Sequence, residues 1–293
     1  MHKISPLKIH DLVVLRMMNR DASFSAHTHV ASNFRIMRKR YIQYKTSMGS
    51  PFVLSPLVFQ QDFKDKLIYH FSHPRSEFNY ISKIRYKLSP NCCPLCGGLG
   101  SHTVDHYLPK ASFPELTLYS LNLIPACACN ALRSNVTHGT PPHESIIHPY
   151  FDNGLDERLM KVSIQGDLLS DDVDIDFLAL PCSVMHLDKI NFHIEHVIRR
   201  STAKHWMQGK WANLIRNPSS VITAIPDDLV HLSSPALNAY IDKMVADNDK
   251  SHGTPNNWYS MFFYGIRTDA HLLNWLLRHC NGIYDGTIDP MSF

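Results

Sequence analysis

The chain of 293 residues lacks the long apolar runs that membrane-spanning proteins carry. No segment approaches the roughly 18 consecutive apolar residues that a membrane helix needs. The first 16 residues also lack the apolar core of a secretion signal, because polar side chains interrupt them at Lys3, Lys8, His10 and Asp11. Internal repeats and low-complexity tracts are absent as well. We therefore expect a globular, cytoplasmic protein without membrane association, in which 44% hydrophobic residues form a sizeable core.

Charge is scarce overall, since only 19% of the residues are charged, and it is unevenly divided. Residues 1–90 carry 15 Lys or Arg against 5 Asp or Glu, a net charge of +10. Residues 91–293 carry 14 against 21, a net charge of −7. Such asymmetry indicates that the N-terminal region faces a polyanion. The alternative is that the positive charge only keeps a helical region in solution.

Proline, glycine and serine divide the chain into three regions of an α+β protein that is mainly helical. Residues 1–90 form the basic N-terminal region, where apolar side chains at three- and four-residue intervals predict helices near 9–18, 34–44, 63–71 and 81–88. Residues 91–150 are loop-rich, with seven prolines and five charged side chains. Residues 151–293 predict a hairpin of 161–165 with 168–177, and helices over 187–215, 235–246 and 258–279.

Basic side chains lie between the apolar positions of the predicted helix near 34–44. They are Arg35, Arg38, Lys39 and Arg40. On a helix they occupy the face opposite the apolar stripe, where guanidinium and ammonium groups can contact phosphate. We expect this face to bind the backbone of a nucleic acid.

The seven cysteines are clustered, because five of them fall between Cys92 and Cys129. Two residues separate Cys93 from Cys96, and two glycines follow this pair. Cys127 and Cys129 form a second pair, and 30 residues lie between the two pairs. Two such pairs predict one tetrahedral Zn²⁺ ion, which four thiolates leave without an open position for catalysis. The zinc is therefore predicted to be structural. Incidental buried thiols are the alternative.

The residues between and after the two pairs resemble the HNH endonuclease family, whose core is a ββα-metal motif. The resemblance covers about 40 of the 293 residues. Its motif runs from CxxC through DHxxP and a central Asn-Leu to a second cysteine pair, directly followed by His or Asn and then by a basic residue. Here the corresponding positions are Asp105-His106, Asn122, Asn130 and Arg133.

The resemblance implies a role for each of these residues. Asp105 and Asn130 would hold a catalytic Mg²⁺ or Mn²⁺, His106 would act as general base, and Asn122 would brace the loop that carries His106. Arg133 would contact phosphate, and Lys110 is a further nucleic-acid contact. These roles suit phosphodiester hydrolysis, because a neutral imidazole can accept the proton of a water molecule and oxygen ligands favour Mg²⁺.

One spacing departs from the family pattern. The second pair usually encloses two residues, whereas Cys127 and Cys129 enclose one. Either the turn between Cys127 and Cys129 is tighter than usual, or one of these sulfurs does not bind the metal and Cys92 or His102 replaces it. Asn135 is a weaker alternative to Asn130 as metal ligand.

The sequence thus predicts a ββα-metal nuclease core within 91–150, held by zinc and flanked by the regions 1–90 and 151–293. DNA is the expected substrate, with RNA possible, and sequence specificity should be low. Proteins with this motif in helical flanks resemble bacterial anti-phage effectors of the Septu or retron-associated kind, which implies an ATPase or other regulatory partner. A homodimer would allow double-strand cleavage. The alternatives are a non-catalytic zinc-ribbon module that binds nucleic acid, and a restriction or mobile-element endonuclease.

Overall fold

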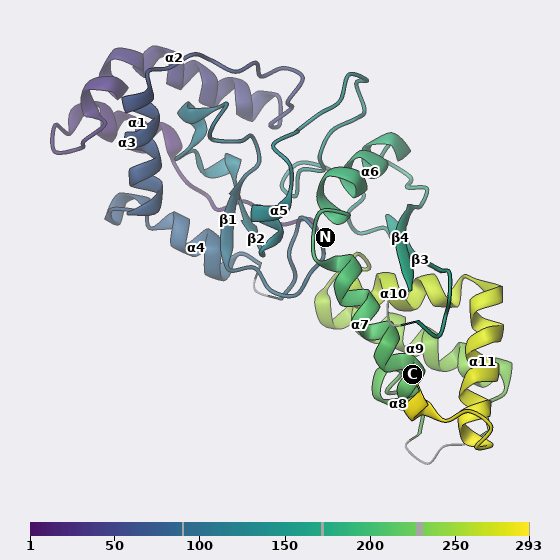
Figure 1. Cartoon of the computed structure of the whole chain (residues 1–293). Coiled ribbons are helices and arrows are strands. Elements are labelled where there is room, and N and C mark those ends of the chain that lie inside the picture. The colour runs from purple at the N-terminus through teal and green to yellow at the C-terminus, as the bar shows by residue number, and fades with distance from the viewer. Residues whose placement is uncertain (90, 171–172, 227–230, 293) are drawn as a thin grey trace.

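The computed structural model describes residues 1–89, 91–170, 173–226 and 231–292. It is elongated, with helices α1–α4 at one end, helices α7–α11 at the other, and a small hairpin and short helix between them (Figure 1). Within these ranges the strands form two antiparallel pairs, β1-β2 and β3-β4. This mixture of helices and small sheets confirms the predicted α+β class.

The N-terminal region consists of helices, as expected. They are α1 (Asp11–Arg20), α2 (His27–Thr46), α3 (Gln61–Ser72) and α4 (Tyr80–Lys87), with a short 3₁₀ turn η1 (Ser76–Phe78) before α4. The apolar stripe of α2 is buried at Met37, Tyr41 and Tyr44, and α1 packs along this helix. Pro90, where the last predicted helix of this region was expected to lead, lies outside the described residues.

The central region has short elements. Strands β1 (Thr103–His106) and β2 (Leu123–Ala126) pair in antiparallel register, with Asp105 opposite Ile124 and His106 opposite Leu123. Two 3₁₀ turns, η2 (Pro114–Leu116) and η3 (Ser120–Asn122), lead from β1 to β2, and α5 (Cys129–Leu132) follows β2. Helix α5 contacts β1, and α4 contacts both strands. The chain order of this unit is therefore strand, strand, helix.

The C-terminal region is built on the hairpin of β3 (Met160–Gln165) and β4 (Asp174–Ala179). Its helices are α6 (Leu187–His193), a π-helical turn η4 (Ile194–Ile198), α7 (Ala203–Arg216), α8 (Pro218–Val221), α9 (Ser234–His252), α10 (Trp258–Arg267) and α11 (Ala270–Tyr284), with a 3₁₀ turn η5 (Pro290–Ser292) near the end. Alternate residues of β3 are buried, and α10 packs against this strand. None of the helices in the described ranges has the length and apolarity needed to cross a bilayer.

Three predictions for the C-terminal region need correction. The helix predicted over 187–215 is broken, because the chain passes through η4 and a turn in which the Ser201 hydroxyl binds the Ile198 carbonyl and accepts the Ala203 amide. The helix predicted over 258–279 is two helices, because the Asp269 carboxylate caps α11 at the Leu272 amide. The second hairpin strand begins at Asp174 rather than 168, and residues 171–172 lie outside the described residues.

The aromatic side chains of α10 belong to the core of the protein. Trp258, Phe262 and Phe263 are buried, and they are part of the same apolar cluster as the N-terminal helices. Gly265 allows the close approach of α10 to β3, because a Cβ atom there would lie 2.3 Å from Cγ1 of Val162. The central region is thus enclosed between two well-packed helical regions.

Candidate metal centre and active site

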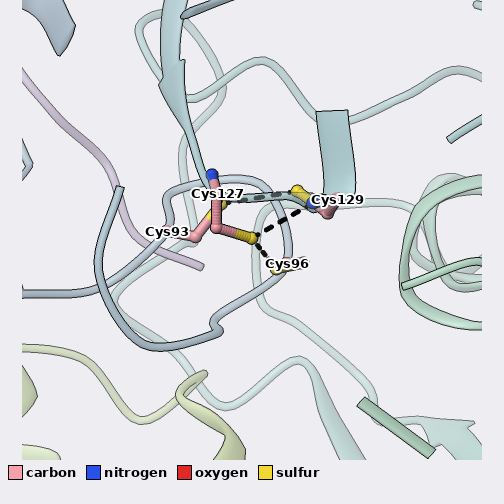
Figure 2. A group of neighbouring side chains, drawn as sticks. All are labelled: Cys93, Cys96, Cys127 and Cys129. Atoms are coloured by element: carbon pink, nitrogen blue, oxygen red, sulfur yellow. Dashed lines mark hydrogen bonds between the residues drawn. The ribbon is translucent and has the colours of Figure 1, made fainter. Parts of the chain in front are cut away.

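The four predicted cysteines converge on one point. The sulfurs of Cys93, Cys96, Cys127 and Cys129 all lie within 4.8 Å of one another (Figure 2). Cys93 Sγ is 3.6 Å from Cys129 Sγ, and Cys96 Sγ is 3.4 Å from Cys127 Sγ. A tetrahedral zinc ion with bonds of about 2.3 Å would separate its sulfur ligands by about 3.8 Å. The cluster could therefore hold a metal such as zinc.

Backbone amides surround this cysteine cluster. The amide of Gly98 donates to Cys96 Sγ at 3.4 Å, and the amide of Cys127 donates to Cys93 Sγ at 3.5 Å. Burial opposes ionisation of Cys93, but hydrogen bonds from the Cys127 and Cys129 thiols outweigh it and hold the pKa of Cys93 well below its usual value. The same thiol contacts raise the pKa values of Cys96 and Cys129, so the two backbone amides are the donors that stabilise negative charge on sulfur for metal binding.

The turn formed by Cys96, Gly97 and Gly98 packs closely on the start of α10. The Trp258 indole donates to the Cys96 carbonyl at 2.7 Å, and a Cβ atom on Gly98 would lie 2.8 Å from the same ring. Gly97 has φ +78°, and a Cβ atom there would lie 2.2 Å from the Asn256 carbonyl oxygen. Both glycines are therefore required by a turn that fits beneath a helix of the C-terminal region.

The short second pair does not displace a ligand. Cys127 and Cys129 both join the cluster although they enclose one residue, because the chain turns into α5 at Ala128 and the Cys129 amide donates to Cys127 Sγ at 3.3 Å. Within the described residues, neither Cys92 nor His102 belongs to the group of sulfurs. The substitution of either residue into the metal site is thus unnecessary.

His106 ends β1 with its ring largely buried. Its Nε2 lies 3.0 Å from the Thr117 carbonyl, which can only accept, so Nε2 carries the proton. The other nitrogen, Nδ1, forms no hydrogen bond with a described residue. Burial, together with the nearby Lys110 ammonium, lowers the pKa of His106 to about 3. The ring is therefore neutral near pH 7, with a free lone pair.

Asp105 is buried beside His106 and forms an ion pair with Arg133. The Arg133 Nε donates to Asp105 Oδ2, and its Nη2 donates to the His106 carbonyl at 2.8 Å. Burial raises the pKa of Asp105, although the Arg133 charge opposes that shift. The remaining nitrogen of Arg133, Nη1, is buried without a partner among the described residues. Arg133 thus lies against the carboxylate and the backbone of β1.

Both asparagines lie close to β1. Asn130, on α5, donates from Nδ2 to the Val104 carbonyl at 3.2 Å, and its Oδ1 accepts no hydrogen bond from a described residue. Asn122 is fully buried and forms two hydrogen bonds with the backbone of Leu108. Its Oδ1 accepts the Leu108 amide at 2.8 Å, and its Nδ2 donates to the Leu108 carbonyl at 3.0 Å. This contact braces the loop after His106, which is the position expected for Asn122.

The predicted basic residues are divided between surface and interior. Arg35, Arg38 and Lys39 are exposed on α2, and the Lys110 ammonium lies 5.2 Å from the centre of the Phe71 ring. Arg40 was expected on the phosphate-binding face, and that expectation is wrong, because its side chain is buried against Glu115, with 3.0 Å between Nε and Oε1. It also donates to the Ser55 carbonyl at 2.7 Å. Arg40 therefore holds the loop after α2 in place.

Several contacts of the site were not predicted. His193 accepts the Ile147 amide at Nδ1 and donates from Nε2 to the Leu95 carbonyl at 2.7 Å, which ties the first cysteine pair to α6. The ring of Phe71 on α3 lies 4.4 Å from that of His106. The Tyr107 hydroxyl donates to the Ile146 carbonyl at 2.7 Å. These residues are distant in sequence from their partners, so no spacing pattern could have indicated them.

Comparison with known proteins gives one partial similarity. Over 65 residues the chain is 35% identical to protein ea31 of Escherichia phage lambda. This stretch is 22% of the chain, and the chain spans 22% of the phage protein. No protein-family model and no solved structure matches the chain. The cysteine cluster and the geometry of β1, β2 and α5 therefore carry the functional argument.

Proposed function

We propose that this chain is a metal-dependent endonuclease of the HNH type that hydrolyses phosphodiester bonds in DNA. One observation carries the proposal: α5 places Asn130 and Arg133 against the strand that bears Asp105 and His106. The cysteine cluster lies at the start of α5 and so fixes that helix. In this proposal the cluster holds structural Zn²⁺, because four thiolates satisfy a tetrahedral ion completely.

In this proposal Asp105 and Asn130 would hold a second, hard cation beside His106. Asp105 supplies a carboxylate and Asn130 an amide oxygen without a partner among the described residues, and oxygen ligands of this kind suit Mg²⁺ or Mn²⁺. The Arg133 guanidinium already forms an ion pair with Asp105, so this carboxylate already binds a positive charge. A bound divalent ion supplies charge that stabilises the phosphate as it becomes more negative.

His106 is the proposed general base. Its Nε2 proton is directed at Thr117, which leaves Nδ1 to accept a proton from water. The low pKa of the free ring makes it a weak base, but the negative charge of a bound phosphate raises the proton affinity of an imidazole beside it. The backbone contact from Thr117 keeps the ring oriented while the proton is transferred.

Arg133 and a divalent cation would compete for Asp105. Release of the guanidinium from Asp105 would leave it next to the reacting phosphate, where it can form charge-assisted hydrogen bonds. The same ion pair favours the second candidate function, a zinc-ribbon module that binds nucleic acid without cleaving it, because Asp105 is already neutralised. Binding of Mn²⁺ to the wild-type chain, followed by electron paramagnetic resonance, distinguishes the two.

Cleavage of supercoiled plasmid in Mg²⁺ or Mn²⁺ tests the proposed activity. The wild-type chain should relax or linearise the plasmid, and His106→Ala should lower the rate by about 10²- to 10⁴-fold, the usual contribution of a general base. The exposed His102, just before β1, offers a matched control, and His102→Ala should retain activity. Zinc content and thermal midpoint should be unchanged in both variants. Equal degradation by the wild-type chain and His106→Ala would exclude this function.

The biological setting is a prediction from the HNH resemblance. An anti-phage effector would need a partner such as an ATPase to restrain it, and co-purification from the native operon would identify one. The phage origin of the similar protein agrees with the alternative of a mobile-element endonuclease. Incubation with an RNA oligonucleotide in place of the plasmid tests cleavage of RNA. Size-exclusion chromatography tests formation of a homodimer.

A further inference from the structure

A cavity of about 310 Å³ lies beside the proposed active site. Three segments line it: the loop after α2 at residues 51–56, the turn after β1 at residues 109–113, and the segment beyond α5 at residues 135–138. We call it the loop pocket. Its volume is at the lower end of the range for ligand pockets and is large enough for a nucleobase.

The loop pocket and His106 share one segment of chain. Pro109, at the pocket, is three residues after His106, a separation of at most about 10 Å. The segment then passes Phe113 in the pocket wall and reaches Thr117, whose carbonyl binds the His106 ring. On the other side, Asn135 follows Arg133 by two residues, at most about 7 Å. One nucleotide can therefore bridge the pocket and the phosphate site.

The lining offers an aromatic face and free polar groups. Phe52 is 40% exposed, and its ring centre lies 4.8 Å from that of His138. The side chains of Ser112, Asn135 and Thr137 form no hydrogen bond with any described residue. His138 donates from Nδ1 to the Gly139 carbonyl, so its Nε2 is an acceptor. Stacking on an aromatic ring together with hydrogen bonds to a polar edge is how proteins hold unpaired bases.

We propose that the loop pocket binds the base of an unpaired nucleotide next to the phosphate at His106. The proposal rests on the nuclease function above and assigns its substrate class, nucleic acid with an unpaired or extruded base at the cleavage position. Buried Arg40 is a positioning residue for this pocket, because it binds Ser55 in one wall and Glu115, two residues beyond Phe113, near the other. A base stacked inside a duplex cannot use the Phe52 ring, because the neighbouring bases cover its faces.

Binding to three DNA duplexes in the non-cleaving His106→Ala background tests this proposal. The first duplex has one unpaired adenosine, the second has an abasic residue at that position, and the third is fully paired. We expect the first to bind about tenfold or more tightly than the others, since base stacking on an aromatic ring contributes that much. Phe52→Ala should remove this preference, and Phe52→Trp should retain it. Fluorescence anisotropy gives the affinities.

Val53→Ala is the matched control, because Val53 is an exposed neighbour of Phe52 in the same loop and does not line the pocket. It should leave the preference unchanged. Equal affinity for the three duplexes, or an equal decrease for all three in Phe52→Ala, would overturn the proposal. Either result leaves plasmid cleavage by the wild-type chain untouched, whereas failure of the nuclease function would appear as absence of that cleavage. A normal thermal midpoint of Phe52→Ala confirms that it is folded.

Discussion

The central and C-terminal regions are stabilised by different means. The C-terminal region relies on regular helices whose ends carry side-chain caps, with Ser233 at α9, Asn257 at α10 and Asp269 at α11. The central region has two strands and one helix of four residues each, so few of its backbone groups are paired within elements. It depends on the cysteine cluster and on side chains that bind its carbonyls.

Those side chains come largely from outside the central elements. The Tyr150 hydroxyl donates to the Leu123 carbonyl at 2.7 Å, the Trp258 indole to Cys96 at 2.7 Å, and the Tyr44 hydroxyl to Leu121 at 3.2 Å. Buried carbonyls need such partners when no secondary structure supplies them. The central region, which carries the proposed chemistry, therefore depends on the rest of the protein and on the cysteine cluster for its stability. Four predictions test this contrast with the C-terminal region.

Loss of the metal should have the largest effect. Cys96→Ser removes one of four sulfur ligands, and structural zinc binds peptides with an apparent free energy of about 10–16 kcal/mol. We expect loss of zinc and fast hydrogen exchange across residues 91–150, while α9 and α11 stay protected. Cys182→Ser, in the C-terminal region, is the control and should retain zinc. Equal loss of protection against hydrogen exchange in the central and C-terminal regions would show that the two regions are not stabilised by different means.

Disruption of the buried ion pair should come next. Arg40→Met keeps the aliphatic volume but leaves Glu115 without its charge partner, and such a loss costs about 3–5 kcal/mol. The comparison is Arg267→Met, which breaks the partly exposed pair with Asp242 in the C-terminal region and should cost at most about 1 kcal/mol. Urea unfolding measures both. Similar costs for the two variants would show that Arg40 has no special structural role.

Acid should weaken the contact between the first cysteine pair and α6. Burial lowers the pKa of His193 to about 3 from an unfolded value near 6.5, so the unfolded chain binds the proton more readily. This contribution to stability is complete above pH 6.5 and falls by about 1.4 kcal/mol per pH unit as the pH decreases towards 3. His193→Gln should flatten the decrease between pH 7 and 5, whereas the exposed His271→Gln should not.

The exposed basic residues of α2 should affect stability least. Replacement of Arg35, Arg38 and Lys39 by Gln should leave the thermal midpoint almost unchanged, because these side chains are exposed. Binding to DNA should nevertheless depend less on salt, because the slope of log affinity against log salt falls by about one for each phosphate that the protein no longer neutralises. An unchanged slope would place the nucleic acid on another face.

Local patterns predicted much of this architecture. The stripe of Met37, Tyr41 and Tyr44 was sufficient to predict α2, because a helix of this length buries one face wherever it packs. The breaks after η4 and at Asp269 were missed. They depend on single side chains that bind the backbone, and such bonds leave the apolar periodicity unchanged on either side.

The sequence by itself determined the cysteine cluster, because Cys93, Cys96, Cys127 and Cys129 are close within each pair and such paired cysteines are typical of metal sites. It also placed Asp105 and His106 side by side on one strand. Only the tertiary structure decided that Arg133 pairs with Asp105, that Arg40 is buried, and that the rings of Phe52 and His138 pack together in the wall of the loop pocket. Such contacts join residues tens of positions apart, and whether a charge or ring is buried depends on all the elements packed around it.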